Sequence, residues 1–311
     1  MSKQATLEWK ANPGKHSTLR RREAIQGYLL ISPWVLGFLA FTLFPFVASF
    51  VLSLTKFRPY PELVGFQNYI KAFAGDPLFW GSLKRSFLFG ALSVPLGILG
   101  SLVCALLLNQ RLRGTPIFRM LYYLPSLTPI VAASMLWIWI FQPDFGVLNY
   151  LLGKVGIDGP GWLNSIEWAL PSLVIMSLWG TVGGDRMIIF LAGLQGVPQE
   201  LFDAAMIDGA NAWRRFWHIT LPMISPTMFF NLVLGIIGAL KVFAPAYIAT
   251  DGGPAYATWF YVLHLYQQAF VYSNMGYASA LAWIFFVIVL IFTLVQAKLS
   301  GKWVYYAAEV R

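Results

Sequence analysis

The chain has 311 residues and a formal net charge of +9, and 58% of its residues are hydrophobic against only 11% charged. Soluble domains average about 25% charged residues, so the composition excludes an ordinary soluble protein and points to the lipid bilayer. The basic excess could suggest nucleic acid, but membrane topology explains it, and no nucleic-acid partner is predicted.

Membrane spans are the predicted elements, since crossing a bilayer core of about 30 Å takes roughly 20 mostly apolar residues. Helices and closed barrels alone satisfy their backbone in lipid, and these apolar windows are too long and even for barrel strands. The sequence therefore predicts an all-α polytopic membrane protein with six transmembrane helices. The six windows are residues 28–54, 86–108, 117–141, 169–194, 223–249 and 277–297.

A polar tail, residues 1–26, precedes the first window and carries Arg20, Arg21 and Arg22. A twin-arginine export signal is one interpretation. It is disfavoured because the apolar run exceeds the 7–15 residues of a typical signal and has no clean cleavage site, and because five more spans follow. The arginines are expected to hold the N-terminus in the cytoplasm.

Orientation follows from the excess of Lys and Arg in cytoplasmic segments. With the N-terminus inside, basic residues of the inner segments outnumber those of the outer segments by 14 to 6, so both termini are predicted to be cytoplasmic, facing anionic lipid headgroups. The inner residues are Lys3, Lys10, Lys15, Arg20, Arg21, Arg22, Arg111, Arg113, Arg119, Arg214, Arg215, Lys298, Lys302 and Arg311. The outer residues are Lys56, Arg58, Lys71, Lys84, Arg85 and Lys154.

One membrane domain is predicted over 27–299, followed by a cytoplasmic C-terminal tail, 300–311. Of its outer segments, 55–85 is expected to fold back over the membrane, and 142–168 is turn-rich with short helical potential. The third begins with a Gly-Gly-Pro turn in TDGGPAYAT.

No catalytic site, cofactor or metal is predicted. The three Gly-Lys pairs lack the upstream glycine and the following Ser or Thr of a nucleotide-binding P-loop, so this chain does not hydrolyse nucleotide by that mechanism. His16, His218 and His264 are too scattered for a zinc site. A polytopic membrane enzyme would need clustered His, Asp or Ser near one face, and no such cluster is visible.

The segment Glu200–Pro222, ELFDAAMIDGANAWRRFWHITLP, is charged and half apolar although it lies between two predicted spans. Pro198 can occupy the first turn of a helix, and Asp208-Gly209 ends it, because glycine suits a left-handed C-terminal cap. A second short helix should follow, with Trp213 among its apolar residues. Helices this short rarely persist alone in water, so they need a surface to pack on. That surface could be the protein's own spans or a separate partner.

This segment closely resembles the EAA loop of ABC-transporter importer permeases, whose pattern is E-A-A-x-x-x-G-x(9)-I-x-L-P. Asp203 stands where Glu is usual, which keeps the charge on a side chain one methylene shorter. The stretches at 27–45, 190–205 and 250–270 resemble the carbohydrate-uptake branch, specifically its first permease subunit of maltose or glycerol-phosphate type. The residues on pattern positions are Asp203, Ala204, Ala205, Gly209, Ile219, Leu221 and Pro222, followed by Pro226.

The resemblance implies the type I importer permease fold, in the cytoplasmic membrane of a bacterium or archaeon. It implies that loop 196–222 is a coupling helix seated on a separate ATPase subunit, where ATP would be hydrolysed. The implied partners are a second related permease, two ATP-binding cassette subunits, an extracytoplasmic solute-binding protein docking on 55–85, 142–168 and 250–276, membrane lipid, and a carbohydrate substrate. The coupling residues would be Glu200, Asp203, Ala204, Ala205, Asp208, Gly209, Ala210, Phe216, Ile219, Leu221 and Pro222.

Alternatives remain for the solute and the energy source. Glycerol phosphate or another polyol-like solute fits the same class. A secondary transporter that uses no ATP would predict inverted repeats or a relay of acids inside the spans, and neither is visible.

Candidates for the substrate path are polar or aromatic residues within the spans, namely Asp185, Arg186, Asn231, Lys241 and Tyr247. A charge at mid-membrane costs roughly 2.5–3.5 kcal/mol on insertion scales, so each charged residue within a span is expected to have a functional or structural role. These charges could line a path that binds sugar hydroxyls or a charged group on the substrate. They could instead form a buried ion pair, such as Asp185 with Lys241, that fixes helix positions. Aromatic residues such as Trp137 and Trp179 could stack on sugar rings or simply pack.

Overall fold

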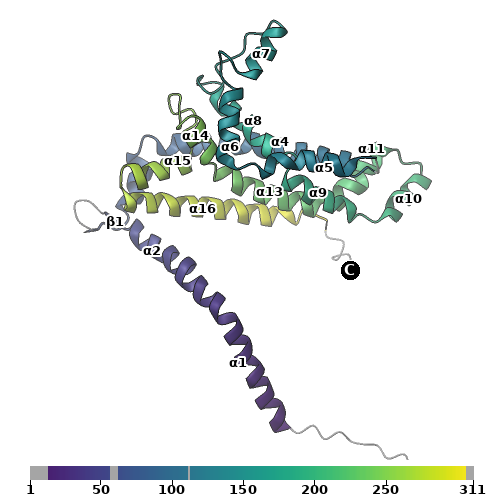
Figure 1. Ribbon diagram of the computed structural model, residues 1–311. Coiled ribbons are helices and arrows are strands. Elements are labelled where there is room, and N and C mark those ends of the chain that lie inside the picture. The colour runs from purple at the N-terminus through teal and green to yellow at the C-terminus, as the bar shows by residue number, and fades with distance from the viewer. Residues whose placement is uncertain (1–12, 57–61, 111–112, 306–311) are drawn as a thin grey trace, which may run out of the picture.

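The computed structural model describes residues 13–56, 62–110 and 113–305, and this part of the chain is almost entirely helical (Figure 1). Its only strands are the two-residue pair β1 (Thr55–Lys56) and β2 (Glu62–Leu63), which are antiparallel. Several basic residues of the orientation argument, Lys3, Lys10, Arg58, Arg111 and Arg311, lie outside the described residues.

The first span leaves the body of the molecule (Figure 1). It consists of α1 (Pro13–Phe38), a π-helical turn η1 (Leu39–Leu43) and α2 (Phe44–Ser53). Helix α1 begins at Pro13, inside the predicted tail 1–26, whose first 12 residues lie outside the described ranges. The most apolar part of Arg20–Ser53 has no buried residue. Only the end near α2 packs on the body, where Phe46 and Phe50 lie 4.7 and 5.0 Å from the ring of Trp283 on α16 (Met275–Ser300).

Helix α4 (Phe79–Leu108) is the centre of the body and packs against α8 (Ala169–Thr181), α9 (Asp185–Gln195) and α13 (Ser225–Leu240). Small residues let these backbones approach closely, as is usual in membranes. A Cβ on Gly100 would lie 2.8 Å from Val182, and Ser101 donates a hydrogen bond to the Thr181 carbonyl at 3.1 Å.

Two of the predicted spans are bent. Helices α5 (Thr115–Tyr123) and η3 (Leu124–Leu127) meet α6 (Ile130–Ile140) at 95°, where Pro129 cannot continue a helix, and α8 meets α9 at 49°. A further break separates α13 from α14 (Ala244–Ala249). Among the described residues four helices are long and apolar enough to cross a membrane, or up to six if each bent pair is one span.

The outer segments contain short elements: α3 (Gln67–Ile70), η2 (Lys71–Gly75), α7 (Val147–Lys154), α15 (Tyr261–Tyr266) and η5 (Gln267–Val271). Helix α4 begins at Phe79 rather than near 86, so Lys84 and Arg85 lie within it and not in the outer segment. The reason is packing: Phe79 and Leu83 are buried in a cluster with Tyr261, Tyr277 and Leu281, which extends the helix beyond its apolar window.

Candidate functional site

The charged segment forms a helical knuckle, which we define as residues 198–223. It contains α10 (Gln199–Ile207), α11 (Ala212–Arg215), η4 (Phe216–Thr220) and α12 (Leu221–Met223). Pro198 is the N-cap of α10 and lies one position before the helix, not within its first turn. The knuckle lies at one end of the body, opposite to β1 and α15 (Figure 1).

A left-handed glycine ends the first knuckle helix, as predicted. Gly209 has φ +76°, and its N–H donates to the Met206 carbonyl at 3.1 Å, while the Ala210 N–H donates to Ala205 at 2.8 Å. This is a Schellman cap. A Cβ on Gly209 would meet no atom within 4 Å, so the backbone conformation, and not crowding, requires glycine there.

The second knuckle helix is capped by Asn211, whose Oδ1 accepts a hydrogen bond from the Arg214 N–H at 2.9 Å. It presents an aromatic cluster in which the rings of Trp213, Phe216 and Trp217 are 5.6–6.2 Å apart. Ile207 is 87% exposed and Trp213 68% exposed.

The knuckle is not covered by the protein's own spans, because neither α10 nor α11 contains a buried residue. Asp203 accepts a hydrogen bond from Gln199 at 3.2 Å. Of the predicted coupling residues, Glu200, Asp203, Ala204, Asp208 and Gly209 are exposed, and Ala205, Ala210, Phe216, Ile219, Leu221 and Pro222 are half-buried.

A cavity of about 700 Å³ lies where the bent helices are interrupted. Asp185, Arg186 and Lys241 line it together with Trp179. Asn231 and Tyr247 do not: Asn231 is buried and donates to the Thr227 carbonyl of its own helix at 3.0 Å. The ring of Tyr247 packs 5.3 Å from both Phe243 and Tyr266.

The alternative of an ion pair between Asp185 and Lys241 is wrong for this structure. Within the ranges that the structure describes, no ion pair joins these two residues. Asp185 instead accepts a hydrogen bond from the Tyr123 hydroxyl at 3.1 Å. Trp137 packs against Phe141 and Trp179 at 4.9 and 6.1 Å, so its ring is part of the helix packing behind the cavity.

Comparison with known proteins decides the family. Residues 93–304 match the family described as the binding-protein-dependent transport system inner membrane component. The chain belongs to this family. The expected resemblance and the all-α importer permease fold are thereby confirmed, and the family is one of transport permeases, not of enzymes.

Relatives of this permease cover nearly the whole chain. It is 43% identical over 305 residues to the probable ABC transporter permease YesP of Bacillus subtilis, covering 96% of this chain and 98% of the relative. It is 36% identical over 290 residues to the trehalose/maltose permease MalF of Thermococcus litoralis, covering 91% and 96%. A chain of a bacterial alginate ABC transporter structure shares the fold, with a TM-score of 0.81 at 23% identity, covering 92% and 96%.

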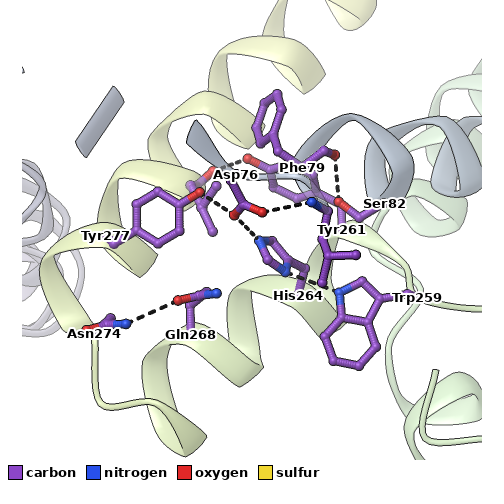
Figure 2. Close-up of polar contacts among 11 residues, drawn as sticks. Asp76, Phe79, Ser82, Trp259, Tyr261, His264, Gln268, Asn274 and Tyr277 are labelled. Carbon is purple, nitrogen blue, oxygen red and sulfur yellow. Dashed lines mark hydrogen bonds and ion pairs between the residues drawn. The ribbon is translucent and has the colours of Figure 1, made fainter. Parts of the chain in front are cut away.

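Four side chains form a polar network at the end of the permease away from the knuckle, and the sequence did not reveal it. We call this network the hub; its residues are Asp76, Trp259, His264 and Tyr277 (Figure 2). Asp76 Oδ2 accepts hydrogen bonds from His264 Nε2 at 2.8 Å and from the Tyr277 hydroxyl at 2.5 Å. Its Oδ1 accepts from the Leu78 N–H at 2.9 Å. The hub therefore ties the start of α4 to α15 and α16. In the sequence, His264 stands only among three histidines too scattered for a zinc site, and no local pattern connects it to Asp76.

His264 in the hub is neutral. The Trp259 Nε1–H can only donate, and it lies 3.1 Å from His264 Nδ1, so Nδ1 is the acceptor and Nε2 carries the proton given to Asp76. Burial lowers the pKa of His264 below its ordinary value, although Asp76 opposes this. Burial by itself would raise the pKa of Asp76, but hydrogen bonds from Tyr277 and Leu78 and the neighbouring His264 outweigh it and lower that pKa.

Proposed function

We propose that this permease forms half of the translocation path of an ATP-driven, binding-protein-dependent sugar importer. A carbohydrate is the favoured solute because a relative is named for trehalose/maltose transport, and the glycerol-phosphate or polyol alternative stays within the same class.

The knuckle carries this proposal. It presents exposed Ile207 and Trp213 on two helices that the other described residues leave uncovered. Exposed apolar surface of this kind marks an interaction site. Together with the EAA pattern, it supports the knuckle as the coupling segment for a separate ATPase subunit, with hydrolysis in that subunit.

The uncovered first span supports a second permease as partner. Thirty-four residues, Arg20–Ser53, have a mean hydropathy of 2.3 in their most apolar part and contribute no buried residue there. The assembly would hold two permeases and two ATPases, and a solute-binding protein would dock on 55–85, 142–168 and 250–276. Both termini and the knuckle would be cytoplasmic.

In the proposed mechanism, the packed helices would move as one rigid body when the knuckle moves. Closure of the ATPases on ATP would move the two coupling segments together. The packed helices would then rock from inward-open to outward-open, as in other domain rotations about an interface.

Replacing Gly209 with Val tests the proposal, because a β-branched residue disfavours the left-handed backbone of the Schellman cap. We expect reduced ATPase co-purification and a loss of ATP-dependent uptake. Gly114→Val is the matched control: Gly114 also has a positive φ, +87°, and an added Cβ would meet only Phe118, at 3.8 Å, but the residue lies outside the knuckle and the proposed docking segments. Unchanged uptake and ATPase association in Gly209→Val would falsify the coupling role.

A further inference from the structure

The cavity carries more positive than negative charge. Arg186 and Lys241 are two cations, whereas Asp185 is the only carboxylate among the described residues that line the cavity. The Oδ1 of Asp185 already accepts a hydrogen bond from the Tyr123 hydroxyl. The walls therefore offer a net positive charge to whatever enters.

Arg186 is held in place by backbone and not by a counter-charge. Its guanidinium lies between α4 and α13, in a slot formed by two glycines: a Cβ on Gly97 would lie 2.7 Å from Nη1, and one on Gly235 would lie 3.2 Å from Nη2. Among the described residues, no hydrogen-bond acceptor or carboxylate pairs with it. An unpaired cation in the membrane interior is costly, and such residues face a water-filled cavity or a substrate path.

The rest of the lining suits a sugar. Ser93, Ser126, Thr128, Ser134, Ser177 and Thr181 line the cavity, and their hydroxyls can accept hydrogen bonds from sugar hydroxyls. Trp179 adds a flat apolar surface. The volume of about 700 Å³ lies within the range of small-ligand pockets.

We propose that this cavity receives a sugar bearing an acidic group, that Arg186 binds the acidic group, and that Lys241 adds to its attraction. The inference rests on the proposed sugar import. The planar guanidinium fork pairs in bidentate fashion with carboxylate and with phosphate alike. Both uronic acids and sugar or glycerol phosphates therefore share the required chemistry.

The first experiment uses the complete complex in proteoliposomes with its binding protein and ATP. Uptake is measured for short uronate oligosaccharides, for the same mixture after carboxyl reduction to neutral sugars, and for glycerol phosphate. We expect the acidic mixture to enter at least about tenfold faster than its reduced counterpart, since hydrogen bonds to charged groups contribute about 1.5–3 kcal/mol.

The outcomes separate this inference from the proposed function. Uptake of glycerol phosphate in place of uronates supports the anion site and assigns it to phosphate. ATP-driven uptake of neutral sugars alone overturns the anion site and leaves the importer intact. No ATP-driven uptake of any sugar or phosphate overturns the importer itself and the anion site with it.

Variants then assign the effect to Arg186. Arg186→Gln is expected to lower acidic-solute uptake about tenfold, Arg186→Lys less, and neither to reduce whatever neutral-sugar uptake exists. Arg113→Gln, which removes an exposed cation outside the cavity, the knuckle and the docking segments, is the control and should change nothing. An equal fall for all solutes would show a purely structural arginine and overturn the proposal. If Arg186→Gln does not assemble, Lys241→Gln decides: acidic uptake should fall about threefold, and unchanged uptake overturns it.

Discussion

The hub and the cavity both place ionisable side chains inside one membrane protein, but they treat the charges in opposite ways. At the hub, the side chains of His264 and Asp76 are 1% and 7% exposed, and both carboxylate oxygens and both imidazole nitrogens have hydrogen-bond partners. In the cavity, the guanidinium of Arg186 packs closely against Gly97 and Gly235. It has no ion-pair partner in the part of the chain that the structure describes.

This difference separates structural from functional polarity. A buried polar network that is fully satisfied fixes one arrangement of its elements, and the hub does so for the outer ends of α4, α15 and α16. An unsatisfied cation adds nothing to stability and is available to a ligand. Breaking the hub should therefore damage the fold, whereas removing the cavity charge should damage only transport.

Asp76→Ala should have the largest effect on stability. It leaves the His264 Nε2–H, the Tyr277 hydroxyl and the part-buried Leu78 N–H without their acceptor, and each buried donor left unsatisfied costs about 1–3 kcal/mol. The measurement is thermal unfolding of the purified permease in detergent. Asp158→Ala, at an exposed outer position, is the control and should change stability by less than about 0.5 kcal/mol. Equal melting temperatures for the two variants would sink the structural role of the hub.

Trp259→Phe should have a smaller effect. It keeps an aromatic ring but removes the donor to His264 Nδ1, and a net hydrogen bond contributes about 0.5–1.5 kcal/mol. Trp168→Phe offers a comparison, since that ring also lies in the outer part and makes an edge-to-face contact with Trp162 at 5.3 Å. A melting temperature no lower for Trp259→Phe than for Trp168→Phe would contradict the assigned tautomer.

Sequence predicted the features that repeat or follow a fixed local rule. Apolar windows predicted all-α spans, and Gly209 marked a left-handed helix end, because both depend on neighbouring residues. The bends at Pro129 and at the start of α9 could not be predicted. Each falls inside one continuous apolar window, and hydropathy carries no information on the direction of a helix. The hub joins Asp76 to residues 188 and 201 positions away, and no local pattern reveals such a contact. Asn231 and Tyr247 were grouped with the cavity because composition cannot show which way a helix face turns.

The pH dependence of stability should also come from the hub. The pKa of His264 is lowered in the fold from an ordinary value near 6.5. Above pH 6.5 both folded and unfolded states are neutral and stability is complete. As pH falls below 6.5 the unfolded state takes up the proton first, so stability declines until the folded pKa is reached. Asp76 has its lowered pKa below about 3.8 and contributes only at lower pH. Lys71 also faces this site.

Melting temperatures between pH 7.5 and 4.5 measure this decline. His264→Gln should remove most of the slope, whereas His218→Gln should retain it, since His218 is exposed on the knuckle. A slope that survives in His264→Gln would assign the pH dependence to another group.

Arg186→Met should have the smallest effect on stability. The direction of its change in melting temperature distinguishes the cavity from the hub most clearly. Met keeps an unbranched apolar chain in the slot between Gly97 and Gly235 and removes a charge that no described residue compensates. Replacing buried charge with apolar side chains is often neutral or stabilising, so we expect an unchanged or raised melting temperature alongside the loss of acidic-solute uptake. A melting temperature lowered as far as that of Asp76→Ala would show that Arg186 holds the helices together as the hub does, and the distinction between a closed structural network and an open binding site would be lost.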